Sequence, residues 1–294
     1  MGAHFGPAGN SLSFFEKGFK HSYEAPAYVK SMGLDAYEYS AGNGITGGEG
    51  VFRRIGEEAR AEGVQLSLHT PYFISLSGTD PEKRLKSLSY IEKSLWASEL
   101  MGADIIVIHC GSAAKISREE AMKLSADTLY RALEKFPDTP VRFGVETMGK
   151  VNQLGTLEEV VELCRMDKRL WPVVDFGHLN ARNKGGYFLT TDDYRRVFDT
   201  VATRLDDQRA VNMHCHFSKI EYTDAGEKKH LTFSDRTFGP DYLPLCACLA
   251  RENLSPRIIC ESDGTMAEDA LEMKRAYRSF LKEEEEGGGG EENL

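Results

Sequence analysis

The sequence has no stretch that could cross a membrane. A membrane-spanning helix needs about 20 consecutive apolar residues, and no run in the 294 residues approaches that length. The first ten residues, MGAHFGPAGN, also lack the charged segment followed by an apolar one that marks a secretory signal. We therefore expect a cytoplasmic protein that makes no membrane contact.

Cysteine and positive charge are also sparse. The six cysteines are scattered, and Cys246 and Cys248 form a single CxC with no second pair to complete a zinc ribbon. We expect the six cysteines to be reduced structural thiols, which fits a cytoplasmic location.

Lysine and arginine total 36 against 46 acidic residues, for a net charge of -10. This balance excludes a basic coat over the whole chain but leaves room for a local basic groove.

The composition predicts one globular domain followed by a tail. Hydrophobic residues make up 41% of the chain, which is enough for a large core. Residues 283–294, with the sequence EEEEGGGGEENL, offer nothing that a core could use. We predict a single domain over residues 1–282 and a disordered acidic, glycine-rich tail over residues 283–294.

Short apolar runs alternate with longer helix-like segments. Strands are predicted at residues 2–6, 34–40, 64–70, 103–109, 141–147, 171–177, 211–219 and 257–263. Helices are predicted at residues 49–62, 81–101, 117–136, 156–166, 190–205, 240–252 and 266–282. No GxGxxG or P-loop follows the first strand, which weighs against a doubly wound nucleotide-binding sheet. Eight strands, each followed by a helical segment, predict a (β/α)₈ TIM barrel.

Six of the predicted strands end in a histidine or a carboxylate. In a (β/α)₈ barrel the carboxyl ends of the strands surround one face, so these side chains should converge on a single cavity. Histidine and carboxylate together suit Zn²⁺ or Mn²⁺ better than Mg²⁺ or Ca²⁺. The sequence therefore predicts a metal centre built from His69, His109, Glu146, Asp175, His216 and Glu261.

Glu146 is the best candidate for a bridging ligand, because a carboxylate has two oxygens. Two cations about 3.5–4 Å apart can stabilise the attacking and the leaving oxygen of a phosphoester together. His214 and His216 are two residues apart and point to the same strand face, so either could be the ligand and the other a supporting residue.

Two further histidines could extend the centre. His178 follows Asp175 by three residues, and a turn just beyond the strand could present both side chains to neighbouring metals. His230 lies in the sequence GEKKHLTF after the seventh strand and could close the site from above.

Several short motifs coincide with these positions. They are GAH at 2–4, HTPY at 69–72, IHCGS at 108–112, VET at 145–147, DFGH at 175–178, HFSK at 216–219 and CES at 260–262. Together they make the chain similar to the endonuclease IV family over most of residues 1–280. That family consists of metal-dependent apurinic/apyrimidinic endonucleases with a xylose isomerase-like TIM barrel. The resemblance implies cleavage of the DNA backbone 5′ to an abasic site.

The resemblance also implies a ligand set for three zinc ions. His69 and His109 would bind one zinc, and Glu146 would bridge to a second, completed by Asp175, His216 and Glu261. The third would use His178 and His230 with an aspartate two residues before the latter. This chain has Lys228 at that position, and Glu227 or Glu221 could replace the missing carboxylate.

Catalytic and substrate-binding roles follow from the same comparison. We assign catalysis to Glu146 and Glu261, and substrate binding to Tyr72, His214 and Lys219. The family places a DNA-inserting arginine in the loop after the second strand, whereas residues 40–50 here have the sequence SAGNGITGGEG. Basic residues in the predicted active-face loops could contact phosphates: Lys115, Lys150, Arg182, Lys184 and Lys219.

Three hypotheses for the function remain at this point. The first is a phosphodiesterase that acts on DNA with abasic sites through a metal-bound hydroxide, working as a monomer with two or three Zn²⁺ or Mn²⁺ ions. The second is a one-metal sugar isomerase or epimerase of the same barrel superfamily, centred on Glu146, Asp175, His216 and Glu261. The third is a barrel that binds a metal or ligand without turnover. The phosphodiesterase is favoured by four histidines that a one-metal isomerase does not need, namely His69, His109, His178 and His230.

Overall fold

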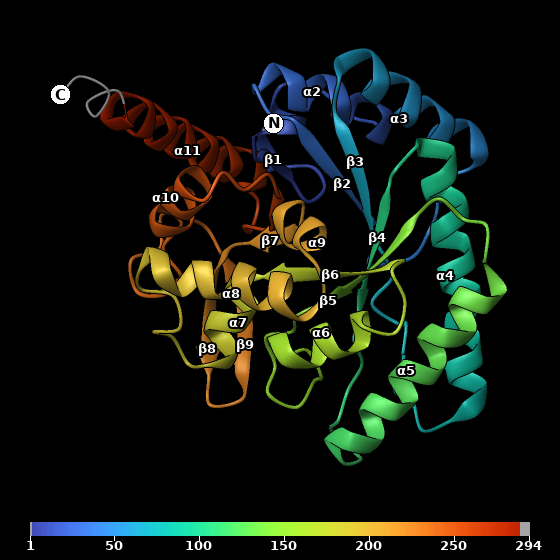
Figure 1. Cartoon of the computed structure of the whole chain (residues 1–294). Helices are drawn as coiled ribbons and strands as arrows, with labels where there is room; N and C mark the ends of the chain where they lie inside the picture. Colours follow the sequence, from blue (N-terminus) through green and yellow to red (C-terminus); the bar gives the residue numbers. More distant parts are fainter. Residues whose placement is uncertain (1, 289–294) are drawn as a thin grey trace.

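Eight parallel strands form a barrel in the computed structural model, which describes residues 2–288 (Figure 1). Their order around the sheet is β1-β10-β7-β6-β5-β4-β3-β2. The strands are β1 (His4–Pro7), β2 (Ala36–Ser40), β3 (Gln65–His69), β4 (Ile105–His109), β5 (Arg142–Glu146), β6 (Leu170–Asp175), β7 (His214–Phe217) and β10 (Arg257–Cys260). The (β/α)₈ prediction is confirmed, and every predicted strand is present.

The barrel closes between β1 and β2. The backbone N–H of Gly9 donates to the carbonyl of Glu38 at 2.8 Å, and that of Asp35 donates to Phe5 at 2.9 Å. Gly6 lies so close to β2 that a Cβ atom there would be 1.7 Å from the carbonyl oxygen of Ala36. A side chain at this position would therefore force the first and last strands of the sheet apart.

Helices surround the barrel in the order that the sequence predicts (Figure 1). The helices with predicted counterparts are α3 (Glu49–Glu62), α4 (Pro81–Met101), α5 (Arg118–Lys135), α6 (Leu157–Cys164), α8 (Thr191–Arg204), α10 (Leu243–Arg251) and α11 (Met266–Gly288). Ser117 caps α5 by accepting from the N–H of Glu120, and Thr156 with Glu159 forms a capping box on α6. Shorter segments are α1 (Leu12–Glu16), η1 (Ser22–Glu24), α2 (Ala25–Ser31), α7 (Phe176–Arg182) and α9 (Asp207–Val211).

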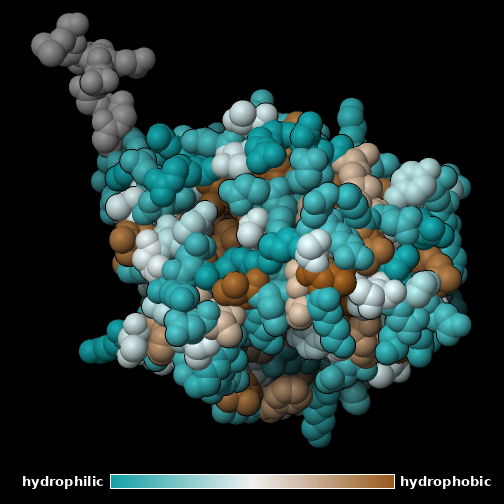
Figure 2. All heavy atoms as spheres, turned by 90° about the horizontal axis from the view of Figure 1, so that it is seen from below, coloured by the Kyte–Doolittle hydropathy of each residue, from teal (hydrophilic) through white to brown (hydrophobic). Residues whose placement is uncertain are grey.

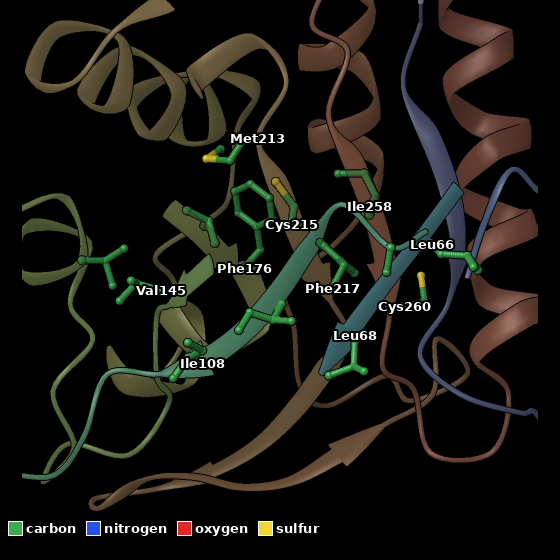
Figure 3. Packing of buried hydrophobic residues seen from close by; sticks show 14 of the residues in the cluster. Leu66, Leu68, Ile108, Val145, Phe176, Met213, Cys215, Phe217, Ile258 and Cys260 are labelled. Carbon is green, nitrogen blue, oxygen red and sulfur yellow. The ribbon is translucent and has the colours of Figure 1, made fainter. Parts of the chain in front are cut away.

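Alternation along each strand divides its side chains between two cores. Leu68, Ile108, Cys215 and Phe217 belong to the large outer core between the sheet and the helices (Figure 3). The residues between them point into the barrel, where one side is a small apolar cluster of Ile105, Val107, Trp171 and Val173. The inward residues of β2, β3 and β7 are polar instead, and they lie beneath the strand ends that carry the predicted ligands.

Three local features differ from the sequence-based expectation. The turn predicted after Asp175 is the helix α7 (Phe176–Arg182), capped by the Asp175 carboxylate, which accepts from the N–H of His178 at 2.7 Å. The loop predicted around His230 is an antiparallel hairpin of β8 (Lys219–Thr223) and β9 (Gly226–Leu231). Helix α11 continues through Gly288, because glutamate is a good helix former and the preceding turns are already formed. Residues 289–294 of the predicted tail lie outside the described residues.

No helix among residues 2–288 is both long and apolar enough to cross a membrane.

Candidate metal centre

The carboxyl ends of the barrel strands bring the predicted ligands together. One group consists of His69 at the end of β3, His109 at the end of β4 and Glu146 at the end of β5, with ligand atoms within 4.8 Å of one another. Oε2 of Glu146 lies 3.4 Å from Nε2 of His69 and 3.3 Å from Nε2 of His109. Two imidazoles and one buried carboxylate oxygen thus surround a space of the size that a divalent cation needs.

The second oxygen of Glu146 faces a different group. Oε1 of Glu146 lies 2.9 Å from Nδ1 of His216, and Glu261 Oε1 lies 3.5 Å from that same nitrogen. Asp175 completes a group of four whose ligand atoms also lie within 4.8 Å of one another. Glu146 therefore has one oxygen in each group, which is the geometry that a bridging carboxylate requires.

A third group, formed by His178, His230 and Glu261, lies where α7 meets the β8–β9 hairpin, and Glu227 lies beside its two histidines. Glu227 Oε2 lies 3.5 Å from Nε2 of His178, and its Oε1 lies 3.9 Å from Nε2 of His230. Lys228 instead pairs with Glu221 on the outer side of the hairpin. Of the two replacements that the sequence left open, the structure therefore brings Glu227 to the histidines and holds Glu221 away.

A β-bulge explains this choice. Glu221 pairs with Lys229 and Tyr222 pairs with Glu227, so Lys228 is an extra residue on the β9 side of the hairpin. An extra residue shifts the alternation of side chains along a strand. The bulge thus turns Glu227 toward the cluster, where an unbroken strand would place residue 228.

Each of four histidines is held through one ring nitrogen and presents the other to the cluster. Nδ1 of His69 contacts the Thr70 carbonyl at 3.0 Å, and Nδ1 of His178 contacts the Thr147 carbonyl at 2.9 Å. The partners of the other two are the Ser218 hydroxyl for His230, at 2.8 Å, and the Glu38 carboxylate for His216, at 3.0 Å. Such contacts fix the ring orientation and the tautomer of metal-ligating histidines.

The histidines and carboxylates of the cluster shift one another's pKa values. Burial lowers the pKa of His69, but Glu146 outweighs it and raises that pKa to about 9. Burial lowers the pKa of His109 to about 3, and the neighbouring charge on His69 adds to this effect. Burial also raises the pKa of Glu261. Of the two imidazoles that face this oxygen of Glu146, the pKa shifts thus favour the protonated form of His69 and the neutral form of His109.

Buried polar atoms without hydrogen-bonding partners test whether a cation fits. Among the described residues, Glu146 Oε2 and Asp175 Oδ2 are buried and accept no hydrogen bond, although a buried carboxylate oxygen normally has a partner. Both atoms face the space between the histidines. The donor set is five imidazoles with four carboxylates, which suits Zn²⁺ or Mn²⁺ and would be costly to bury without a cation.

Glu38 is a member of the cluster that the sequence analysis missed. It lies in the middle of β2, is fully buried, and groups with His214 and His216. A search restricted to strand ends overlooks a carboxylate in mid-strand. The signal that could have revealed it is a glutamate between Tyr37 and Tyr39 in an apolar strand.

The predicted substrate-binding residues take three different positions. Tyr72 lies over the cluster, with its ring centroid 5.5 Å from that of His69 and 5.6 Å from that of His109, and it is 65% exposed. His214 is buried below the cluster and hydrogen-bonds to Glu38. Lys219 donates to the carbonyls of Phe233 and Asp235. Only Tyr72 of the three lines the cavities at the cluster, so the predicted substrate contacts of His214 and Lys219 are not supported.

Two cavities open over the cluster. One of about 360 Å³ is lined by the metal-site histidines together with Tyr72, Lys150 and Gln153, and one of about 460 Å³ by Tyr72, Lys229, His230 and Asp263. The guanidinium group of Arg182 donates hydrogen bonds to backbone carbonyls, and the ammonium group of Lys184 pairs with Asp224. Lys115 lines a separate pocket.

Viewed from below, the molecule presents a largely hydrophilic surface with isolated hydrophobic residues (Figure 2).

Comparison with known proteins places this arrangement in a family. The family model described as a xylose isomerase-like TIM barrel matches residues 26–282, and the chain belongs to that family. An uncharacterised protein of Methanocaldococcus jannaschii is 27% identical over 278 residues, which cover 93% of this chain and 96% of that protein. The similarity therefore extends along nearly the whole chain, to a relative whose name states no activity.

The relatives with named activities differ from one another. A probable endonuclease 4 of Acholeplasma laidlawii is 35% identical over 113 residues, which cover 35% of this chain and only 38% of that relative. Among solved structures, endonuclease IV from Thermus thermophilus matches with a TM-score of 0.70 and 18% identity, over 95% of this chain and 99% of that one. A D-tagatose 3-epimerase-like protein matches with a TM-score of 0.68 and 17% identity, over 97% and 99%. At these identities the structural matches establish the fold alone.

Proposed function

We propose that the protein is a metal-dependent phosphodiesterase that hydrolyses the DNA backbone 5′ to abasic sites. The observation that carries this proposal is the position of Glu146, whose two oxygens face two separate ligand groups. Two cations bridged by a carboxylate suit the attack and departure of oxygens at phosphorus. The partial endonuclease 4 relatives support the same reaction class.

The residues divide the work between holding cations and receiving the substrate. His69, His109 and Glu146 would hold one cation, and Asp175, His216 and Glu261 would complete a second with Glu146. A third would lie between His178, His230 and Glu227. Zn²⁺ or Mn²⁺ bound there would activate water and neutralise the negative charge that develops at the phosphoryl group.

The remaining groups around the cavity would orient a nucleic acid. Lys150 lines the cavity beside the cluster, where an ammonium group can pair with a phosphate of the bound strand. Tyr72 presents an exposed ring at the entrance, which suits stacking against the unpaired base or the gap opposite an abasic site. Glu146 and Glu261, which both face Nδ1 of His216, would hold in place the cations that contact the reacting phosphate.

A sugar epimerase is the second candidate. The group of Glu146, Asp175, His216 and Glu261 offers one cation and two carboxylates that could act as acid and base on a hydroxy-carbonyl substrate. The epimerase-like structures among the fold's neighbours make this candidate specific. It gives no role to His69 or His109, which is why the phosphodiesterase explains more of the site.

One duplex oligonucleotide with a single synthetic abasic site separates the two candidates. We expect incision immediately 5′ to that site with Zn²⁺ or Mn²⁺, and none in the matched duplex with an intact nucleotide. His109→Asn should abolish incision, while a one-metal epimerase would keep its activity on ketoses in that variant. Absence of incision at micromolar protein, with two or more metal equivalents bound, would exclude the phosphodiesterase function.

A further inference from the structure

Glu38 occupies a place that the proposed reaction does not use. Its carboxylate lies inside the barrel beneath the cluster and is completely buried. A buried carboxylate is costly unless hydrogen-bond donors surround it. Here Oε2 accepts from the Ser67 hydroxyl at 2.8 Å and contacts Nε2 of His214 at 2.9 Å. Two donors thus hold this carboxylate in one orientation.

The other oxygen of Glu38 faces His216. Oε1 lies 3.0 Å from Nε2 of His216 as a charge contact, and neither atom makes a hydrogen bond among the described residues. The opposite ring nitrogen, Nδ1, faces Glu146 at 2.9 Å and Glu261 at 3.5 Å. The ring of His216 is therefore set between a buried carboxylate on one side and the cation position on the other.

His216 differs in this respect from the other anchored histidines of the centre. His69, His178 and His230 have neutral carbonyl or hydroxyl oxygens at the outer ring nitrogen, whereas His216 has a charged carboxylate in contact with it. A carboxylate on the outer nitrogen of a ligating imidazole orients the ring and strengthens its electron donation to the metal.

We propose that Glu38 is a positioning residue that acts through His216 to set the affinity of the second cation site, with Ser67 and His214 as its anchors. This inference rests on the proposed metal centre. It gives His214 the role of supporting Glu38 from below the cluster. It also explains why three polar side chains occupy barrel-interior positions of β2, β3 and β7 that are commonly apolar.

Competition between the protein and a zinc chelator tests the proposal. Removal of an outer partner of a metal-bound histidine typically weakens binding 10- to 100-fold, and we expect a loss in that range for one zinc equivalent in Glu38→Gln. Ser67→Ala should cause a smaller loss, because the carboxylate remains. Asp104→Asn is the control, because it removes a carboxylate at the start of β4, at the end of the barrel opposite the cluster, and should leave zinc affinity unchanged.

A double-mutant cycle distinguishes positioning from a general structural effect. Because Glu38 acts through His216, Glu38→Gln should cause no further loss of affinity in a His216→Ala background. It should keep its effect in a His109→Ala background, where the second site remains. Circular dichroism and thermal unfolding of the metal-free variants verify that each one is folded.

Three outcomes would overturn the proposal. Equal affinity of Glu38→Gln and the wild type would show that the carboxylate has no influence on the metal. An undiminished effect in the His216→Ala background would show that Glu38 does not act through that ring. Complete loss of one equivalent at saturating zinc would make Glu38 a ligand itself. If the wild-type protein binds no zinc at all, the proposed metal centre itself is wrong. The titration of the wild-type protein therefore distinguishes a failure of the metal centre from a failure of the role proposed for Glu38.

Discussion

Glu146 and His216 face each other at 2.9 Å, through Oε1 of the carboxylate and Nδ1 of the ring. The other oxygen of the same carboxylate lies between His69 and His109. The first prediction follows from this geometry. Glu146→Gln should lower incision activity by at least about 100-fold, which is the upper end of the effect of losing an outer-shell partner, because an amide cannot bridge two cations. Retained activity in a steady-state incision assay would show that Glu146 is not the bridge.

Removal of metal should destabilise the protein. Glu38, Glu146 and Asp175 are fully buried carboxylates in one cluster, and a bound cation would offset their mutual repulsion. A ligand at 100 times its dissociation constant stabilises the native state by about 2.7 kcal/mol. Dialysis against a chelator should therefore lower the melting temperature measured by calorimetry, and added Zn²⁺ should restore it. An identical melting temperature before and after dialysis would argue against a buried metal centre.

Glu227 should hold the third cation. Its carboxylate lies near His178 and His230 because of the bulge at Lys228. We expect Glu227→Gln to bind one zinc equivalent fewer by atomic absorption and to incise abasic DNA more slowly. Lys228→Ala is the matched control on the adjacent residue, and its zinc content should match that of the wild type. A lost equivalent in Lys228→Ala instead would assign the effect to hairpin structure.

Tyr72 should contribute to substrate binding without contributing to metal binding. Stacking of one base on an aromatic ring contributes about 1–3 kcal/mol, so Tyr72→Ala should weaken binding of abasic DNA roughly tenfold. Its zinc content should not change. Tyr130→Ala removes a similarly exposed tyrosine from α5 and should leave DNA binding unaffected. Fluorescence anisotropy with a labelled duplex provides the measurement, and equal affinities for both variants would contradict the prediction.

Gly42 supports that position of Tyr72. The N–H of Tyr72 donates to the Gly42 carbonyl at 3.1 Å, and a Cβ atom on residue 42 would lie 2.3 Å from the tyrosine ring. Gly42→Ala should therefore displace the ring and reproduce the loss of DNA affinity that we expect for Tyr72→Ala. Gly48→Ala, in the same loop but with open space around it, is the control.

Asp104 lies at the end of the barrel opposite the metal centre, and its ion pairs make the stability of the fold depend on pH. Burial alone would raise the pKa of Asp104, but the guanidinium groups of Arg257 and Arg142 lower it to about 2. A lowered pKa means that the ion pair stabilises the fold above the unfolded pKa of about 3.9 and loses this contribution as the pH falls toward 2. After allowance for solvent screening, Asp104→Asn should lower the free energy of unfolding by about 1 kcal/mol at pH 7. Urea titrations should show the difference disappearing between about pH 4 and pH 2.

The sequence predicted most of the fold because the signals for it are local. Apolar runs bounded by capping patterns indicated each barrel strand and the larger helices, and parallel strands place their carboxyl ends on one face. The errors lie where a segment has no periodic apolar pattern. The hairpin β8–β9 is polar and contacts water, and α7 begins at the strand end itself with Asp175 as its cap.

By itself the sequence determined which side chains reach the active face, since a strand's last inward residue is fixed by its own alternation. Only the tertiary structure decided how these side chains combine. Glu38 and His214 are 176 positions apart and meet because β2 and β7 face each other across the closed barrel. Glu227 reaches His178 because one extra residue in β9 shifts the register of the hairpin. Contacts across the barrel and the register of a bulge depend on the assembled backbone, and no local pattern encodes either.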